Sequence, residues 1–372
     1  MKQIGNEFQP DYYYHPGVFL EEELENIGMS QAELSKRTGI TTKTINFIIK
    51  GSASISSETA INLEVVLGKP ASYWLNLDSQ YQIAIATEEK DKLLNNELNV
   101  LNEIELKELI SAKWIKWFKD DLQQLKELYR FFGVSSFKQI EQVWSQLKVS
   151  YRTSTQFKQS DLHIYAWLRQ GEICAKKISC KPFSQKKFKE TLNECRKLTT
   201  KGFNEMKDEL QSLCASSGVA VVFIPEIKNV STSGAARWIE KEKALIQLSL
   251  RGKKDDKFWF NFYHEAGHIL LHGRKEQFID NNGKENPLAE GNYQTEENRF
   301  KEKEADEFAA NFLIPKKEFV KFVEIADFTD KNIIDFARLQ GIAPGIVVGQ
   351  LQSRGYIDWS KGNPHKKTYA FD

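Results

Sequence analysis

Residues 258–272 read FWFNFYHEAGHILLH, and this stretch decides the fold of the C-terminal half of the chain. It contains no proline and one glycine, and apolar residues occupy nearly every side of a helix drawn through it. A helix that is apolar all round is buried, so the pattern predicts a core helix. Asp255 and Asp256 are its candidate N-caps, and Gly273 is its candidate C-cap.

The centre of this helix carries His264, Glu265 and His268 in the spacing H-E-x-x-H. Residues four apart share one helix face, so the two imidazoles can converge on one zinc ion. Glu265 projects about 100° further round, where it can accept a proton from an attacking water without being a ligand. Burial of these three side chains without partners is costly, and a metal ion removes that cost. The alternative is a chance match with ordinary core histidines.

A second amphipathic helix follows, with Thr295 as its candidate cap and Pro315 at its end. Its apolar stripe consists of Ala305, Phe308, Ala309, Phe312 and Leu313. Glu302 lies at the edge of that stripe and is the expected third metal ligand. Asp306, one turn on, is placed to hydrogen-bond a ligand histidine. Glu304 points away from the stripe and stays open as a less favoured ligand.

His272 lies one turn beyond His268 on the first of these helices. In a continuous helix His264 and His272 are about 12 Å apart along the axis, so both cannot bind one ion. We therefore expect His272 to be a structural or substrate-side histidine.

These two helices resemble the ImmA/IrrE family of zinc metallopeptidases. The matching pieces are His264-Glu265-Ala266-Gly267-His268 and Glu302-x-x-Ala305-Asp306-x-Phe308-Ala309-Ala310-x-Phe312-Leu313-Ile314-Pro315. The resemblance implies a gluzincin arrangement, in which two histidines and a glutamate hold zinc and Glu265 is the catalytic base. Members of the family commonly cleave a repressor, which implies a repressor, or the chain itself, as the protein substrate. Such domains can also be kept as sensors.

Composition and charge limit the remaining possibilities. At 372 residues the chain is long enough for two or three domains. A net charge of +1 implies no global attraction to nucleic acid, so any such binding must come from local patches. The sequence shows neither an apolar leader nor a run of 18 apolar residues, so we expect a cytoplasmic protein without a membrane span. Its four cysteines lack C-x-x-C spacing and are expected to be free thiols.

The N-terminal part is predicted to be a helical bundle with a helix-turn-helix. Capped helices are expected over residues 31–38, 42–50 and 58–67, opened by Ser30, Thr41 and Ser57, and Pro70 opens a further helix. Gly39 separates the first two of them, and two short capped helices around a tight glycine turn are typical of a helix-turn-helix.

This region resembles HigA-type antitoxins and related XRE-family repressors. The matching pieces are His15-Pro16-Gly17, Ser30-Gln31-Ala32-Glu33-Leu34-Ser35, Thr44-Ile45-x-x-Ile48-Ile49-x-Gly51 and Leu67-Gly68-x-Pro70-Ala71-x-Tyr73-Trp74-Leu75. The resemblance implies that Thr42, Lys43 and Asn46 face base edges of an operator in double-stranded DNA. It also implies that Gln31 and Lys36 contact phosphates. Asn can pair with adenine, and Lys can bind guanine or phosphate, so the residue types suit these roles.

The charge of this module argues against tight binding by one copy. Residues 1–80 contain six basic and ten acidic side chains, so the module is net acidic. Phosphate contacts dominate affinity for DNA, so a net acidic module should bind DNA weakly as a single copy. We therefore expect it to bind as a homodimer. The alternative is a helix-turn-helix retained for dimerisation or protein contact.

At Gly218 the spacing of apolar residues changes from the helical period to that of strands, which predicts a small sheet. Strands are expected over residues 219–224, 234–239 and 244–250, whereas residues 274–297 are polar and expected to form a loop over the site. An edge strand of such a sheet can hold a substrate backbone by strand addition, and Arg237 is a weak candidate for a transition-state contact.

The predicted fold is therefore mainly α and multidomain. Residues 1–84 form a helix-turn-helix domain, residues 85–217 a helical middle region, and residues 218–372 an α+β gluzincin-like zinc peptidase domain with a small sheet and C-terminal helices. The expected function is transcription regulation or antitoxin action combined with zinc-dependent proteolysis of a repressor or toxin. One alternative is a HigA-type repressor whose zinc site is structural or a sensor. Another is a sensor in which DNA or a ligand controls access to the zinc.

Overall fold

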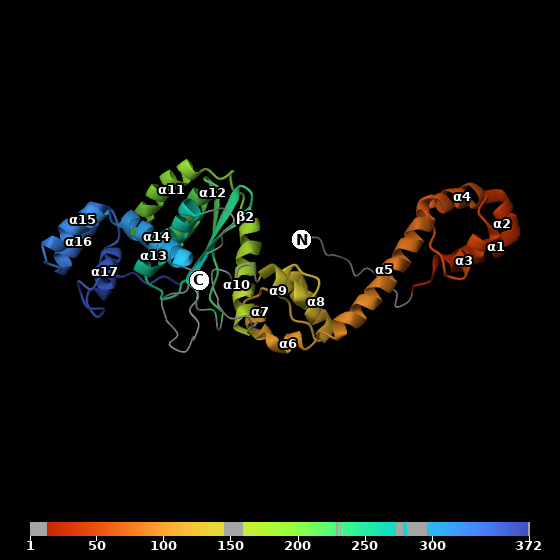
Figure 1. Ribbon diagram of the computed structural model, residues 1–372, viewed down its shortest axis with the longest axis horizontal. Helices are drawn as coiled ribbons and strands as arrows, with labels where there is room; N and C mark the ends of the chain where they lie inside the picture. The colour runs from red at the N-terminus through yellow and green to blue at the C-terminus, as the bar shows by residue number, and fades with distance from the viewer. Residues whose placement is uncertain are drawn as a thin grey trace. The chain divides into compact units, whose positions relative to one another are not determined.

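The structure is a computed structural model that describes residues 13–144, 159–227, 230, 232–272, 278–280 and 296–370 (Figure 1). The chain divides into two compact units, residues 1–98 and residues 99–372. The expected boundary between residues 84 and 85 lies inside a helix of the first unit, and that between residues 217 and 218 lies just before the first strand. Each unit is described by itself.

The first unit is a helical bundle. Its helices are α1 (Pro16–Asn26), α2 (Gln31–Thr38), α3 (Thr42–Ile49), α4 (Ser57–Leu67) and α5 (Ala71–Asn95). The Ser30 hydroxyl accepts a hydrogen bond from the backbone N–H of Glu33, and Gly39 ends α2 at a φ of 76°. Such a left-handed C-cap favours glycine. The cap of α4 is Ser56 rather than the expected Ser57, which is the first helical residue.

The His15-Pro16-Gly17 segment brings α1 against α3. The Nδ1 atom of His15 accepts a hydrogen bond from the Gly17 backbone N–H at 3.0 Å and so caps α1. A Cβ at Gly17 would lie 2.0 Å from the carbonyl oxygen of Ile48, so only glycine allows the two helices to approach this closely. The core beneath them includes the buried side chains of Leu20, Leu34, Ile45, Leu63 and Trp74.

The second unit begins with helices. They are α6 (Val100–Glu103), α7 (Leu106–Ser111), α8 (Asp121–Phe132), α9 (Phe137–Trp144), α10 (Gln159–Lys176), α11 (Gln185–Lys197), a 3-10 turn (Leu198–Thr200) and α12 (Phe203–Ala215). The sheet follows with β1 (Val219–Phe223), β2 (Gly234–Glu240), β3 (Lys243–Leu248) and β4 (Phe278–Asp280). These described strands are arranged in the order β1-β3-β2-β4. β1 runs parallel to β3, whereas β2 is antiparallel to both β3 and β4.

The three predicted strands are confirmed, and β4 corrects the prediction of a loop over residues 274–297. β4 pairs with the first residues of β2, with Gly234 opposite Asp280. A three-residue strand is too short to show an alternating pattern, so only the free edge of β2 specifies it. β1 and β4 are therefore the two edges of the described sheet. The other residues of the expected loop up to residue 295 lie outside the described residues.

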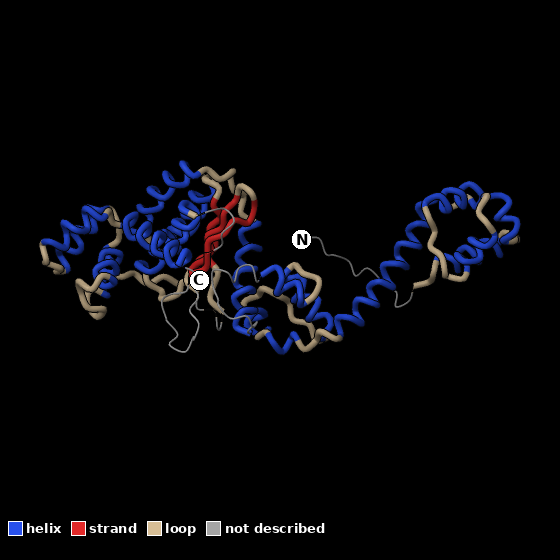
Figure 2. Tube along the Cα trace, in the orientation of Figure 1, coloured by secondary structure: helices blue, strands red, loops and turns tan. Residues whose placement is uncertain are grey.

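Helices cover both faces of the sheet (Figures 1 and 2). On one face, Arg237 donates to the carbonyl of Leu168 at 2.5 Å and the Gln247 amide donates to the carbonyl of Trp167 at 2.7 Å, so α10 packs there. On the other face, Ala236 and Ile246 belong to the core cluster that contains the apolar side chains of the histidine-bearing helix. Since side chains alternate along a strand, Arg237 faces α10 and not the candidate metal ligands. The suggested transition-state role of Arg237 is wrong.

The histidine-bearing helix is α13 (Asp255–Leu271). Its N-cap is Lys254, with no side-chain hydrogen bond, so the expected capping by Asp255 or Asp256 is wrong. Both aspartates lie in the first turn, where negative charge favours the helix dipole. His272 occupies the C-cap, and Gly273 lies outside the described residues.

The remaining helices are α14 (Glu296–Leu313), α15 (Lys316–Glu324), α16 (Asp330–Gln340) and α17 (Pro344–Ser353), with a 3-10 turn over Asn363–His365. The expected cap Thr295 lies outside the described residues, and Pro315 follows α14 as expected. None of the helices described is long and apolar enough to cross a membrane. The core of this unit gathers around α13, which packs on α14, α17 and the sheet.

Candidate metal centre

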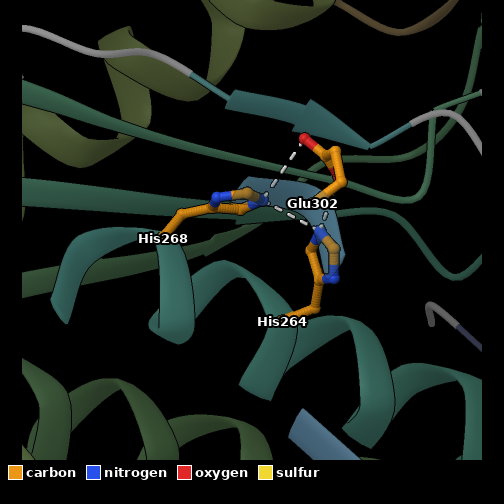
Figure 3. A group of neighbouring side chains, drawn as sticks. All are labelled: His264, His268 and Glu302. Carbon is orange, nitrogen blue, oxygen red and sulfur yellow. Dashed lines mark hydrogen bonds and ion pairs between the residues drawn. The ribbon is translucent and has the colours of Figure 1, made fainter. Parts of the chain in front are cut away.

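Two histidines on one face of α13 form the centre of the site (Figure 3). The Nε2 atoms of His264 and His268 lie 2.9 Å apart, and both side chains are buried. The i to i+4 spacing brings them together, because residues four apart are neighbours on a helix surface.

The carboxylate of Glu302, from α14, meets this pair of imidazoles. Its Oε2 lies 3.2 Å from Nε2 of His264, and its Oε1 lies 3.6 Å from Nε2 of His268. A tetrahedral zinc ion with ligand atoms at about 2.0–2.1 Å separates neighbouring ligands by about 3.3 Å. Two imidazoles and a carboxylate at this spacing fit a zinc ion. In the part of the chain that the structure describes, they are the group of metal-ligating side chains whose donor atoms come within 4.8 Å of one another.

The protonation states of Glu302 and His268 suit a cation. Burial alone would raise the pKa of Glu302, but hydrogen bonds and charge from His264 and His268 lower it to about 2. Burial lowers the pKa of His268 to about 4, although Glu302 acts in the opposite direction. Near neutral pH the carboxylate is therefore ionised and His268 is neutral, which are the forms that bind a metal.

Each histidine is also held at its other ring nitrogen. Oδ1 of Asp306 lies 2.9 Å from Nδ1 of His264. On the other side, Nδ1 of His272 lies 3.0 Å from Nδ1 of His268, and Nε2 of His272 lies 3.3 Å from Oε2 of Glu304. Glu304 thus contacts His272 and is not among the three converging groups. Sequence reasoning did not find this His272–Glu304 pair, although the four-residue spacing from His268 was a usable signal.

Glu265 points from α13 toward the start of β2. Its side chain is fully buried, and a Cβ at Gly234 would lie 2.5 Å from Oε1 of Glu265. Gly267, inside the motif, faces α14, where a Cβ would lie 3.3 Å from the Cα atom of Ala305. The two glycines therefore allow α13 to approach β2 on one side and the Glu302-bearing helix on the other.

The five residues expected at DNA lie on α2 and α3 of the first unit. Lys36, Thr42 and Lys43 are exposed, and Gln31 and Asn46 are half-buried. The opposite side of α3 is anchored by Ile45 and Ile48, which belong to the core of the bundle.

Phe47 extends the exposed side of α3 and was missed by sequence reasoning. It is 43% exposed, and Nζ of Lys43 lies 5.6 Å from the centroid of its ring. An exposed aromatic residue beside Asn46 could contact a thymine methyl group. The sequence did offer a signal for this residue: position 47 is apolar, although the exposed side of α3 otherwise carries polar side chains.

Two family models match the chain, one in each unit. Residues 20–74 match a model described as helix-turn-helix, and residues 214–332 match a model described as IrrE N-terminal-like domain. The second match includes His264, Glu265, His268 and Glu302.

Curated relatives match about a fifth of the chain. Virulence-associated protein I from Dichelobacter nodosus is 32% identical over 80 residues, which are 21% of this chain and 74% of that protein. The uncharacterized HTH-type transcriptional regulator YddM from Escherichia coli (strain K12) is 32% identical over 76 residues, which are 20% of this chain and 81% of that protein.

Solved structures similar to the chain also align with a small part of it. An addiction module antidote protein of a HigA family from Coxiella burnetii is 35% identical, with 23% of this chain and 92% of that chain covered and a TM-score of 0.22. The Pseudomonas aeruginosa antitoxin HigA, solved with the higBA promoter, is 31% identical, with 23% and 95% covered and a TM-score of 0.22.

Proposed function

The chain belongs to the XRE-type helix-turn-helix regulators and carries a C-terminal domain of the IrrE type, and on that basis we propose that it hydrolyses a peptide bond in a protein substrate. The convergence of His264, His268 and Glu302 is the observation that carries this proposal. The proposed substrate is a repressor, a toxin or a second copy of the chain. Cleavage of this substrate would then regulate transcription at an operator to which the first unit binds.

The three converging residues would hold zinc and leave room for a substrate. Bound zinc would polarise the peptide carbonyl and lower the pKa of a water molecule beside it. Catalytic sites hold zinc with three protein ligands, whereas structural sites use four. No fourth His, Cys, Asp or Glu joins the group among the residues that the structure describes, which supports a catalytic site over a structural one.

Glu265 would carry the proton. It follows the ligand His264 directly on α13 and is buried beside Gly234. In this role the carboxylate accepts a proton from the attacking water and then donates it to the nitrogen of the leaving amine. Asp306 and the His272–Glu304 pair would keep the two imidazoles oriented, because a hydrogen bond at Nδ1 fixes the tautomer that binds metal through Nε2.

The substrate would be bound as an extra strand along β4. An edge strand offers unpaired N–H and C=O groups to an extended peptide. β4 is the described edge next to β2, and it pairs with Gly234, the residue against which Glu265 packs. β1, at the opposite edge, is separated from β2 by β3.

Glu265→Gln tests the proposal. We expect the variant to bind zinc with unchanged stoichiometry, measured by atomic emission, and to lose cleavage of the neighbouring gene product or of the chain itself. Glu296→Gln, an exposed substitution at the start of α14, is the control and should cleave normally. Undiminished cleavage by the Glu265 variant would remove Glu265 as the base. If the wild-type chain binds zinc but cleaves neither protein, the alternative of a repressor with a non-catalytic zinc site is favoured.

A further inference from the structure

The connection between α7 and α8 presents a tryptophan to solvent (Figure 1). Residues 112–119 read AKWIKWFK, with three lysines and no acidic residue, and are called the basic loop below. Trp117 is 66% exposed, and Lys113, Lys116 and Lys119 are exposed around it in the sequence. One exposed aromatic side chain is ordinary on a protein surface. A binding role for Trp117 therefore depends on what holds the loop and on the charge beside the indole.

The basic loop is held from α8 by buried hydrogen bonds. Gln124 is only 4% exposed and uses both of its polar atoms on the loop. Its Oε1 accepts from the backbone N–H of Phe118 at 2.8 Å, and its Nε2 donates to the carbonyl of Lys116 at 3.2 Å. The carboxylate of Glu127 accepts from the backbone N–H of Lys116 at 3.2 Å. The backbone on both sides of Trp117 is thus fixed, which lowers the entropy lost when a ligand binds to the indole.

The charge of the basic loop is not neutralised within the chain. Its three ammonium groups form no ion pair with any residue that the structure describes. The acidic side chains that follow belong to α8: Asp120 accepts from the backbone N–H of Gln123 at 2.8 Å, and Asp121 lies in the first turn, where the helix dipole favours negative charge. Glu127 pairs with Arg130 at 2.6 Å. The loop is therefore a local cationic patch on a chain of net charge +1, and it complements a polyanion.

The combination of side chains indicates which polyanion fits. Lysine is depleted at protein–protein interfaces, so an indole beside three unpaired lysines favours nucleic acid over an acidic protein. Sites for single-stranded nucleic acid combine cationic groups for the phosphates with an aromatic ring on which a base stacks. The bases of a duplex are already paired and stacked, so a duplex offers phosphates but no free base face. The chain also carries a helix-turn-helix unit, a module that binds nucleic acid.

We propose that the basic loop binds a single-stranded segment of nucleic acid, with a base stacked on Trp117 and backbone phosphates at Lys113, Lys116 and Lys119. This site is separate from α3, which is expected to read duplex DNA. It includes neither a candidate metal ligand nor the candidate base, so it does not depend on the proposed peptidase activity. Unpaired DNA and RNA share this chemistry.

Fluorescence anisotropy of a labelled oligothymidylate of about twelve nucleotides, titrated with the full-length chain, tests the proposal. At about 50 mM salt we expect a dissociation constant of about 10 µM or tighter. Three phosphate contacts predict that the logarithm of the binding constant falls with the logarithm of the salt concentration at a slope of about −2. An oligouridylate of equal length is the RNA arm. Binding of either strand supports the proposal, and the tighter of the two identifies the preferred source.

Variants of the loop separate stacking from charge. Trp117→Ala should weaken binding at least about fivefold and keep the salt slope, whereas Trp117→Phe should retain most of the affinity because a phenyl ring still stacks. Lys113→Gln, Lys116→Gln and Lys119→Gln combined should weaken binding at least about tenfold and bring the slope close to zero. Trp359→Ala removes another exposed indole, 61% exposed, and should bind as the wild type does.

The helix-turn-helix is separated from the loop by the variant that combines Lys43→Ala with Asn46→Ala. It should bind the single strand as the wild type does, and it should bind a duplex of equal length at least about fivefold more weakly than that strand. Equal binding of duplex and single strand by this variant overturns the proposal. So does displacement of the strand by an equal concentration of oligoglutamate, which would identify a surface for acidic proteins. Absence of binding at about 100 µM chain, or unchanged affinity in Trp117→Ala, also overturns it.

Discussion

The Nδ1 atom of His268, in the last turn of α13, lies 3.0 Å from Nδ1 of His272, the C-cap of that helix. If His268 binds a metal through Nε2, its Nδ1 carries the proton and donates to Nδ1 of His272. His272 then carries its own proton on Nε2, which lies 3.3 Å from the Glu304 carboxylate. These contacts are consistent with the tautomer of His268 that a metal site requires. We therefore propose positioning roles for His272 and Glu304.

Replacement of His272 by alanine should weaken zinc binding about tenfold or more, as loss of a hydrogen bond to a ligand histidine does in other sites. Competition with a chromophoric chelator measures the effect. His365→Ala is the matched control, because His365 pairs with Asp330 and is not part of the metal group. The zinc affinity of Glu304→Gln should lie between those of His272→Ala and His365→Ala, since the amide oxygen of the new Gln side chain can still accept a hydrogen bond from His272. Wild-type zinc affinity in His272→Ala would show that the contact does not orient His268.

Gly234→Ala should impair hydrolysis and leave zinc binding nearly intact. The added methyl group would lie 2.5 Å from Oε1 of Glu265 and must displace that carboxylate. We expect at least about a tenfold loss of kcat, because small displacements of a proton-transfer group are costly. The comparison is Gly202→Ala, where nothing lies within 4 Å of the added carbon. Equal losses in both variants would point to a general effect on folding instead.

Asp255 should make the unfolding free energy of the second unit depend on pH. Burial, together with the charge of Asp256, raises the pKa of Asp255 to about 6, whereas an unfolded aspartate has a pKa of about 3.9. Between these values the folded chain keeps a proton that the unfolded chain releases. Stability contributed by this group is therefore complete below about pH 4 and lost as the pH rises through 6.

Asp255→Asn should remove this dependence and raise the free energy of unfolding near pH 7 by on the order of 2 kcal/mol. Urea unfolding of the metal-free protein between about pH 4 and pH 7, followed by circular dichroism, measures it. Asp208→Asn, an exposed substitution on α12, should keep the wild-type slope. A variant at Asp255 whose pH profile of unfolding free energy runs parallel to that of the wild type would exclude this carboxyl as a source of pH dependence.

Lys43→Ala combined with Asn46→Ala should weaken binding to DNA from the promoter of the chain's own gene. Each base contact contributes about 1–3 kcal/mol, so a loss of about tenfold or more is expected. Gel-shift titration at one stated salt concentration tests this, since phosphate contacts vary strongly with salt. Zinc content should be unchanged. Lys92→Ala removes an equal charge from the exposed part of α5 and should weaken DNA binding much less. Equal losses in the two variants would argue against groove recognition by α3.

Local sequence patterns were sufficient for much of this protein. Ser30 marks the start of α2 and Gly39 marks its end. Both could be predicted because helix capping and left-handed backbone depend on residues that are neighbours in the sequence. The spacing of His264 and His268 places them together because a helix has a fixed repeat. The apolar stripe of α14 likewise placed Glu302 on the side that faces these histidines.

Other features depend on contacts between distant segments, and only the tertiary structure decided them. β4 exists because β2 has a free edge, the role suggested for Arg237 fails because its side of the sheet is covered by α10, and Asp255 is a first-turn residue rather than a cap. A one-dimensional pattern records the period of each element, whereas which faces meet, and how closely, depends on packing among residues far apart in the chain.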